Sequence, residues 1–141
     1  MEHISATEAR KRWSEVLDLA VRQKPQFIKR TRDQLMLSDV DFINTLLSGY
    51  VYEADILKEA DGSITLSLRS MDLIEHAATL SAAKKKLAAA ILDYAMEYYS
   101  DMAYWHSAQN RRDHLPYVMK ALTANDVEQI GAELVCHDGR N

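Results

Sequence analysis

The stretch His3–Leu47, HISATEARKRWSEVLDLAVRQKPQFIKRTRDQLMLSDVDFINTLL, decides how the N-terminal part of this chain folds. Its pattern predicts a strand, an amphipathic helix, two strands and a second helix, in that order. Ser5 and Glu8 have the spacing of a capping box, which places the first helix directly after Ser5. Apolar residues then recur at helical spacing and predict one helix over residues 6–22: Ala9, Trp13, Val16, Leu17 and Ala20.

A short hairpin is expected after this helix. Lys24-Pro25 ends the helix, because the residue before a proline is pushed out of the helical region. Residues 26–30 and 34–37 predict two strands, and Asp33 is the turn residue expected to accept a left-handed backbone. Ser38 is expected to cap the second helix.

Positive charge gathers in the middle of this stretch. From Arg10 to Arg32 there are eight basic residues against two acidic ones, although the whole chain has a net charge of −4. Arg10, Lys11 and Arg12 lie near the start of the expected helix, where cations oppose the helix dipole. The pattern therefore favours a face that meets a polyanion over a helix charged for its own stability. The alternative is a solvated basic surface.

The segments ISATEARKRWSEVLD (4–18) and FIKRTRDQLMLSDVDF (27–42), with a proline between them, resemble the N-terminal domain of the Phd/YefM antitoxins. The resemblance implies a βαββα domain over residues 1–49 that forms a homodimer and binds operator DNA as an autorepressor. It places the DNA contacts at the first helix and the hairpin, here Thr7, Arg10, Lys11, Lys29, Arg30 and Arg32. The family usually has a glycine in the hairpin turn. This chain has none there, which leaves open which basic side chain faces DNA.

After Gly49 the pattern changes to alternation. Tyr52, Ala54 and Ile56 predict a strand that leads to Asp61-Gly62, a strong hairpin signal. The return strand alternates in the same way at Ile64, Leu66 and Leu68, with one buried face. Residues 71–77 add a third expected strand, and a helix capped by Ser81 is expected to run to about Trp105.

The segment 52–95, YEADILKEADGSITLSLRSMDLIEHAATLSAAKKKLAAAILDYA, is similar in order to the HicB antitoxin domain. That resemblance implies a partial RNase H-like ββ(β)α unit that holds a toxin and carries no catalytic set. Residues 107–114 are expected to form a polar loop, followed by helices at 117–122 and after Thr123. The expected fold class is therefore α+β, with residues 50–141 as a ββ(β)α and helical toxin-binding region.

Aromatic and basic side chains in the second part are the candidates for toxin contacts. They are Tyr98, Tyr99, Trp105, Arg111, Arg112 and Tyr117. Aromatic residues and arginine are common in binding hot spots. At helical spacing aromatics form core more often, so an interface and a core both stay open.

Several kinds of site are not expected. One cysteine, Cys136, allows no internal disulfide. His76, His106 and His114 lack the spacing of a helical metal site, and no nucleotide-binding or nucleophile motif occurs, so neither cofactor nor catalysis is expected. The sequence has no long apolar run and no apolar signal region, which predicts a cytoplasmic protein without membrane association.

The preferred hypothesis is an antitoxin that represses its own operon and blocks a RelE/ParE-like mRNA interferase or gyrase poison. The partners are then a second copy of the chain, operator DNA and the cognate toxin. A second hypothesis is a protein-interaction or scaffolding module whose basic cluster is incidental. A third is a small-molecule or nucleic-acid enzyme that uses the RNase H-like segment, which nuclease activity dependent on Asp55 or Asp72 would favour.

Overall fold

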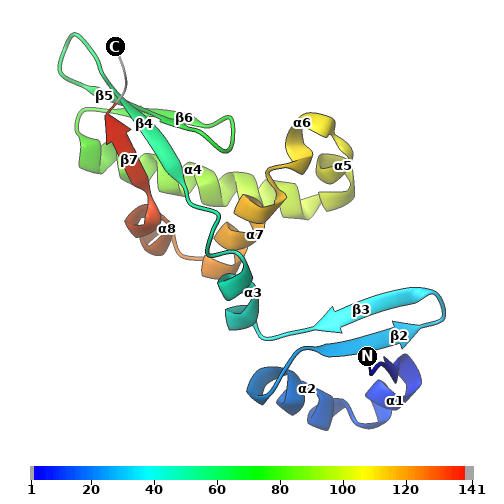
Figure 1. Ribbon diagram of the computed structural model, residues 1–141. Helices are drawn as coiled ribbons and strands as arrows, with labels where there is room; N and C mark the ends of the chain where they lie inside the picture. Colours follow the sequence, from blue (N-terminus) through cyan, green and yellow to red (C-terminus); the bar gives the residue numbers. More distant parts are fainter. Residues whose placement is uncertain (1, 139–141) are drawn as a thin grey trace. The chain divides into compact units, whose positions relative to one another are not determined.

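A computed structural model describes residues 2–138, and the chain divides into two compact units, residues 1–46 (unit 1) and 47–141 (unit 2). Each unit combines a small sheet with helices, so the expected α+β class is confirmed (Figure 1).

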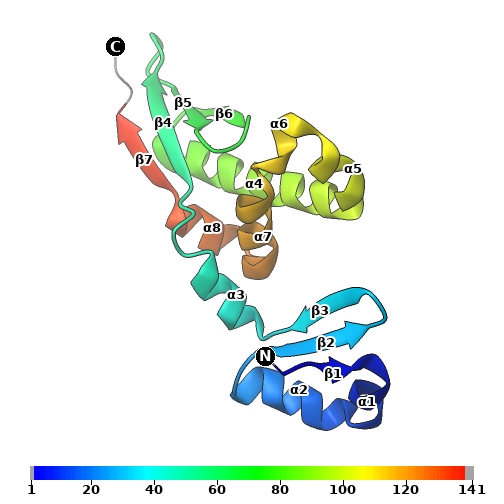
Figure 2. The ribbon, with the colours of Figure 1, turned by 45° about the vertical axis from the view of Figure 1, so that its right-hand side comes forward.

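Unit 1 is a three-stranded sheet with short helices. Its elements are β1 (Ile4–Ser5), α1 (Ala6–Lys11), α2 (Trp13–Arg22), β2 (Gln26–Arg30), β3 (Asp33–Leu37) and α3 (Val40–Leu46). The strand order is β1-β2-β3, with β1 parallel and β3 antiparallel to β2. Figure 2 shows α1 and α2 on one side of these strands.

The start of the first helix is as expected, but the helix is interrupted. Ser5 is the N-cap, and its Oγ accepts a hydrogen bond from the Glu8 N–H at 3.0 Å. The backbone of Arg12 leaves the helical region (φ −116°, ψ 35°), so α1 and α2 are separate helices. The expected single helix over 6–22 is therefore wrong at this one residue.

The break at Arg12 also changes the electrostatics of the basic residues beside it. Arg10 and Lys11 lie in the last turn of α1, where the helix dipole favours cations. The expected opposition between these two charges and the dipole of a long helix is therefore wrong. Whether Arg10 and Lys11 meet an external anion must therefore be inferred from the residues around them.

The hairpin turn differs from the expectation in its left-handed residue. Thr31 has φ 51°, whereas Asp33 is already the first residue of β3. Asp33 pairs with Arg30 across the strands, so the turn is limited to the two residues between them. Asp39 rather than Ser38 caps α3: its carbonyl accepts the N–H groups of Phe42 and Ile43, and its Oδ1 accepts the Asp41 N–H at 3.4 Å.

The described residues of unit 2, up to Asp138, form a four-stranded sheet and five helices. Its elements are β4 (Glu53–Lys58), β5 (Ile64–Leu68), β6 (Ile74–Ala77), α4 (Leu80–Ser100), α5 (Met102–Ser107), α6 (Gln109–Arg112), α7 (Leu115–Ala124), α8 (Val127–Glu133) and β7 (Val135–Asp138). The strand order is β6-β5-β4-β7, antiparallel except that β7 runs parallel to β4. Gly62 turns the β4–β5 hairpin with φ +87°, as the Asp-Gly pair predicts.

The ends of the helices in unit 2 correct several expectations. Thr79 rather than Ser81 caps α4, with its Oγ1 accepting the Ala82 N–H at 3.1 Å. The helix ends at Ser100 because the backbone of Asp101 leaves the helical region (φ −143°), and α5 starts after it. Asp126 rather than Thr123 caps α8. The expected polar loop at 107–114 contains the short helix α6.

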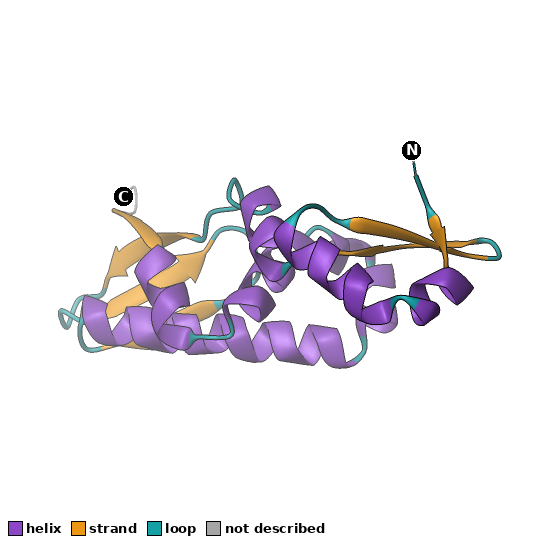
Figure 3. Cartoon of the chain, turned by 90° about the horizontal axis from the view of Figure 1, so that it is seen from below, coloured by secondary structure: helices purple, strands orange, loops and turns teal. Residues whose placement is uncertain are grey.

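The core of unit 2 lies between the sheet and α4. The largest fully buried side chains are Tyr52, Leu66, Met71, Leu87, Ile91, Tyr98, Val118 and Ile130. Helices α7 and α8 pack against α4. Figure 3 shows the strands of this unit beside its longest helix. Helix α8 comes close to α4 at Gly131, where an added Cβ would lie 3.6 Å from Ala88 Cβ.

Candidate functional site

The six expected DNA-contact residues all lie exposed in unit 1. Strand β1 pairs with β2 in parallel, and Ser5, the N-cap of α1, lies beside Lys29. Because β2 runs on from Lys29 into the hairpin turn, the start of α1 and the turn lie at the same end of the sheet. The fold thus brings Thr7 and Arg10 of α1 to the same end as the basic turn.

The basic side chains of this end differ in their surroundings. Lys29 and Arg30 are successive strand residues and therefore point to opposite faces of the sheet. Arg30 Nη2 lies 3.0 Å from Asp33 Oδ2, with both side chains largely exposed. Such a surface pair contributes at most about 1 kcal/mol, so Arg30 is available to a stronger anion. Arg12, by contrast, lies between Glu8 and Glu15, at 3.4 Å from each.

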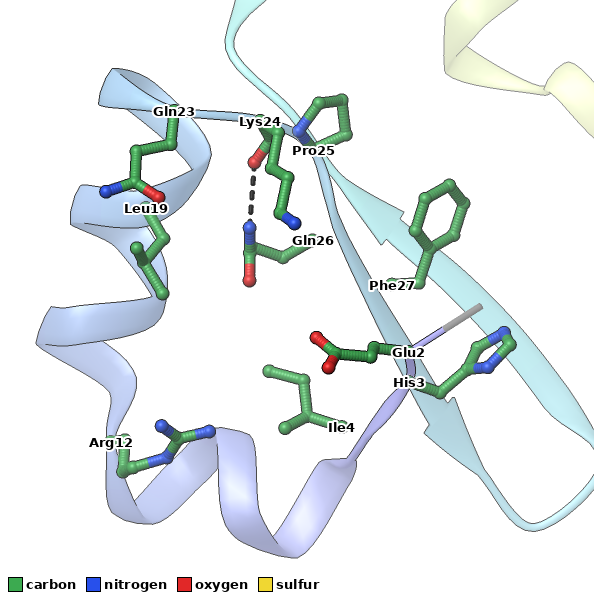
Figure 4. Close-up of a pocket in the computed structure, with 10 residues that line it drawn as sticks. All are labelled: Glu2, His3, Ile4, Arg12, Leu19, Gln23, Lys24, Pro25, Gln26 and Phe27. Atoms are coloured by element: carbon green, nitrogen blue, oxygen red, sulfur yellow. Dashed lines mark hydrogen bonds between the residues drawn. The ribbon is translucent and has the colours of Figure 1, made fainter.

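Unit 1 has little core of its own. Among its described residues, only Ala9, Val16 and Ala20 are buried. A hollow of about 910 Å³ lies between α2 and the strands, and Ile4, Leu19 and Arg12 lie around it (Figure 4).

An apolar row on α2 faces solvent. Trp13, Leu17 and Val21 are spaced four residues apart, and Trp13 is 48% and Val21 62% exposed. The sequence pattern places Trp13 and Leu17 in the buried stripe with Val16. Instead the helix buries the small residues of the stripe and exposes the large ones. This leaves a band of apolar surface that no described residue of the unit covers.

In unit 2, four of the six expected toxin-contact residues pack against their neighbours. Tyr98 is fully buried, and its hydroxyl donates to the Arg111 carbonyl at 3.2 Å. Its ring stacks on Trp105 with a centroid distance of 6.2 Å. The Arg111 guanidinium lies over the Trp105 ring at 5.5 Å. Tyr117 packs edge-on against Tyr50, and its carbonyl accepts the Tyr52 hydroxyl at 2.7 Å.

The other two, Tyr99 and Arg112, are exposed. Tyr98 and Tyr99 are adjacent in sequence but differ completely in burial, because one helical step turns a side chain by about 100°. The assignment of toxin contacts to these six residues stays a prediction.

His114 is the buried titratable group beside this aromatic cluster. Its Nδ1 lies 2.7 Å from the Tyr94 hydroxyl, and the two rings meet edge-on. Burial lowers the pKa of His114 below its usual range, and the nearby positive charge of Arg111 lowers it further. The imidazole is therefore neutral at pH 7.

One of the two acids named for a nuclease, Asp55, is paired with an arginine. Asp55 lies on the sheet face opposite α4, where its carboxylate accepts two hydrogen bonds from Arg69 Nε and one from Nη2 at 2.7 Å. These hydrogen bonds hold the pKa of Asp55 below its ordinary value. Across residues 2–138, no group of three or more His, Cys, Asp or Glu side chains has a metal-binding arrangement.

Within the described part of the chain, no helix has both the length and the apolar character needed to cross a bilayer.

Comparisons with known proteins bear on the whole chain. The sequence matches the PHD_like family, described as "Antitoxin of toxin-antitoxin, RelE / RelB, TA system", over residues 1–136. The fold is similar to the crystal structure of an antitoxin part of a proposed toxin/antitoxin system from Syntrophomonas wolfei subsp. wolfei, with a TM-score of 0.92 and 32% sequence identity. That similarity covers 99% of this chain and 100% of the other. No protein of curated function matches.

Proposed function

The chain belongs to the PHD_like family of antitoxins, and we propose that it binds operator DNA as an autorepressor and neutralises a RelE/ParE-like toxin by direct binding. An antitoxin implies a cognate toxin as its partner. The two units would divide these tasks between them.

DNA binding is proposed for unit 1, and the Phd/YefM subtype with it. The observation that supports this proposal is that one end of the sheet carries six exposed residues, with Lys29 and Arg30 on its opposite faces: Thr7, Arg10, Lys11, Lys29, Arg30 and Arg32. Within residues 2–138, Arg10, Lys11, Lys29 and Arg32 form no ion pair. Phosphate oxygens would give these side chains the charged partners that the unit itself does not provide.

Homodimer formation is proposed through the exposed row Trp13, Leu17 and Val21 on α2. A unit of residues 1–46 with three buried side chains among those described is too small to be stabilised by its own core. A second copy would cover the apolar row and add a second basic end. Two such ends fit a DNA site with two half-sites.

Toxin binding is proposed for unit 2. Its sheet and helices form a core without a partner, which supports a domain that is folded before the toxin arrives. The three antiparallel strands followed by α4 support the HicB-like interpretation of residues 52–95. A scaffolding module without DNA binding is the alternative, and a DNA-binding measurement separates the two.

The test measures binding of the purified chain to its own upstream DNA by fluorescence anisotropy over a series of salt concentrations. For wild type, the logarithm of the affinity should fall linearly with the logarithm of salt concentration, with a slope of about −0.9 per phosphate neutralised. Arg10→Ala with Arg30→Ala should weaken binding on all sequences. The slope should become shallower by about one for each arginine that neutralises a phosphate in the wild-type complex.

The matched control is Arg22→Ala, which removes another exposed cation, at the far end of α2. It should leave the salt slope nearly unchanged. Equal affinity of wild type and the Arg10/Arg30 variant would overturn the proposed contacts. No binding by wild type would favour the scaffolding alternative.

A further inference from the structure

The charges of α4 run against its own dipole. Three lysines, at 84, 85 and 86, lie near its N-terminal end, and three acids, Asp93, Glu97 and Asp101, lie at and after its C-terminal half. A helix is stabilised by the opposite order, with acids at its start and cations at its end. The spacing of the acids adds to this cost, because like charges four residues apart repel each other. Helix stability therefore does not explain these carboxylates.

The three acids also lack ion-pair partners. All three are exposed, and none forms an ion pair with any residue of 2–138. From Leu87 to Asn110 the chain contains these acids and not one lysine or arginine. The row they form thus presents uncompensated negative charge.

An exposed apolar row lies next to the acids. Met96 and Tyr99 are 54% and 65% exposed, and the i, i+3 spacing of Asp93, Met96 and Tyr99 places Met96 between the other two on the surface of the helix. Tyr104 is equally open on α5, the next helix. Figure 1 shows the end of α4 that carries these residues continuing past the strands toward α5. We call the following set the acidic–aromatic surface: Asp93, Met96, Glu97 and Tyr99.

The open face of the four-stranded sheet is the other exposed surface of unit 2. Leu57 and Ile74 are exposed there, around a hollow of about 610 Å³. Two of its acids, however, have a cation beside them. Arg69 Nη2 lies 2.7 Å from Asp55 Oδ1, and Arg69 Nη1 lies 4.0 Å from Glu53 Oε1. The acids of the acidic–aromatic surface have no such partner among the described residues.

We propose that the acidic–aromatic surface is where this chain holds the cognate toxin, through a basic and partly apolar face of that protein. The inference rests on the proposed neutralisation by direct binding and adds its location and chemistry. Tyrosine anchors interfaces because it buries a large rigid ring, and methionine adapts its shape to a partner. The carboxylates would attract lysine and arginine of the toxin and speed its approach.

The charge balance of the two units supports a cationic partner for unit 2. Residues 47–141 contain fourteen acidic and nine basic residues, whereas residues 1–46 contain seven acidic and eight basic ones. A cationic protein is therefore attracted to unit 2 in preference to unit 1. A nucleic acid is repelled from it.

The test uses calorimetric titration of the full-length chain with its purified cognate toxin. Met96→Ala with Tyr99→Ala should weaken binding about tenfold or more, as removal of hot-spot side chains does. Asp93→Asn with Glu97→Gln should weaken binding several-fold at low salt, and the difference from wild type should shrink as salt screens the charges. Both double variants change exposed side chains, and thermal unfolding should show that they remain folded.

Matched controls come from the rest of unit 2. Leu57→Ala with Ile74→Ala removes similarly exposed apolar groups from the open sheet face, and Glu128→Gln removes an exposed acid from α8. Both should bind toxin like wild type.

Equal toxin binding by wild type and the two test variants would overturn the location but not the proposed function. If the Leu57/Ile74 control lost more affinity than the test variants, the proposed location would also be overturned, and the interface would lie on the sheet face. If the test variants lost only self-association, measured by light scattering, the surface would belong to a second copy and the proposal would fail. Absence of any complex with the wild-type chain would overturn the proposed neutralisation itself.

Discussion

The imidazole of His114 and the hydroxyl of Tyr94 form a buried hydrogen bond, with 2.7 Å between Nδ1 and the phenol oxygen. Arg111 donates to the same Tyr94 hydroxyl at 3.3 Å. The hydroxyl can donate to a neutral imidazole, and it would lose this acceptor if Nδ1 were protonated. The geometry thus agrees with the lowered pKa of His114.

The first prediction concerns how the unfolding free energy depends on pH. The unfolded chain binds a proton at His114 near the ordinary histidine pKa of about 6.5, while the folded chain resists protonation. The unfolding free energy should therefore be unaffected by this group above about pH 6.5 and should fall as the pH is lowered toward the depressed folded pKa. Urea unfolding at a series of pH values measures it.

His114→Asn should flatten this dependence, because the amide does not titrate. His3→Asn, at an exposed histidine of unit 1, is the control and should leave the wild-type profile unchanged. An equally steep fall of stability in the His114 variant would show that other groups cause it.

Much of the local structure could be predicted from the sequence, because it depends on neighbours along the chain. The Ser5 cap, the Asp61-Gly62 turn and the alternation at Ile64, Leu66 and Leu68 all follow from short-range rules. Strand β7 could not be predicted in this way. Val135 pairs with Glu53 from the start of unit 2, and nothing near Val135 indicates that partner.

The helix boundaries show a different limit. Each wrong cap, such as Ser81 for Thr79, lies within three residues of the true one, where several capping side chains compete. The breaks at Arg12 and Asp101 have no proline or glycine to mark them. The composition likewise reveals that aromatic residues are concentrated here. Which of them is buried depends on how the helix is rotated about its axis, and in this structure Tyr98 is buried and Tyr99 is exposed.

The second prediction concerns the turn at Thr31. Threonine is β-branched and is disfavoured at φ 51°, whereas glycine adopts that conformation freely. Thr31→Gly should stabilise unit 1 by about 0.5–1 kcal/mol. This is the backbone strain that glycine relieves in the folded state, minus the cost of the greater conformational freedom that glycine gives the unfolded chain. Trp13 is the sole tryptophan of unit 1 and, in a Trp105→Phe background, reports its unfolding. Gly62→Ala, at φ +87°, should have the opposite sign in unit 2.

The third prediction concerns the packing of α8 on α4. A Cβ at Gly131 would lie 3.6 Å from Ala88 Cβ, an ordinary van der Waals distance. Gly131→Ala should therefore gain helix propensity without a clash and raise stability by up to about 1 kcal/mol. Gly131→Leu should destabilise, because the larger side chain must displace Ala88. The measurement is the thermal unfolding temperature of each variant relative to wild type. Equal unfolding temperatures for Gly131→Ala and Gly131→Leu would contradict the close packing of α8 on α4.

The fourth prediction concerns the exposed row on α2. If a second copy covers Trp13, Leu17 and Val21, a charge at Val21 would be buried without a partner in the dimer. Val21→Lys should therefore convert a dimer to a monomer at micromolar concentration, measured by light scattering. Ile74→Lys, on the exposed sheet face of unit 2, adds the same charge at a residue of similar exposure and should leave the mass unchanged. A Val21→Lys variant that keeps the dimer mass would show that the copies meet elsewhere, and the α2 row would then need another partner.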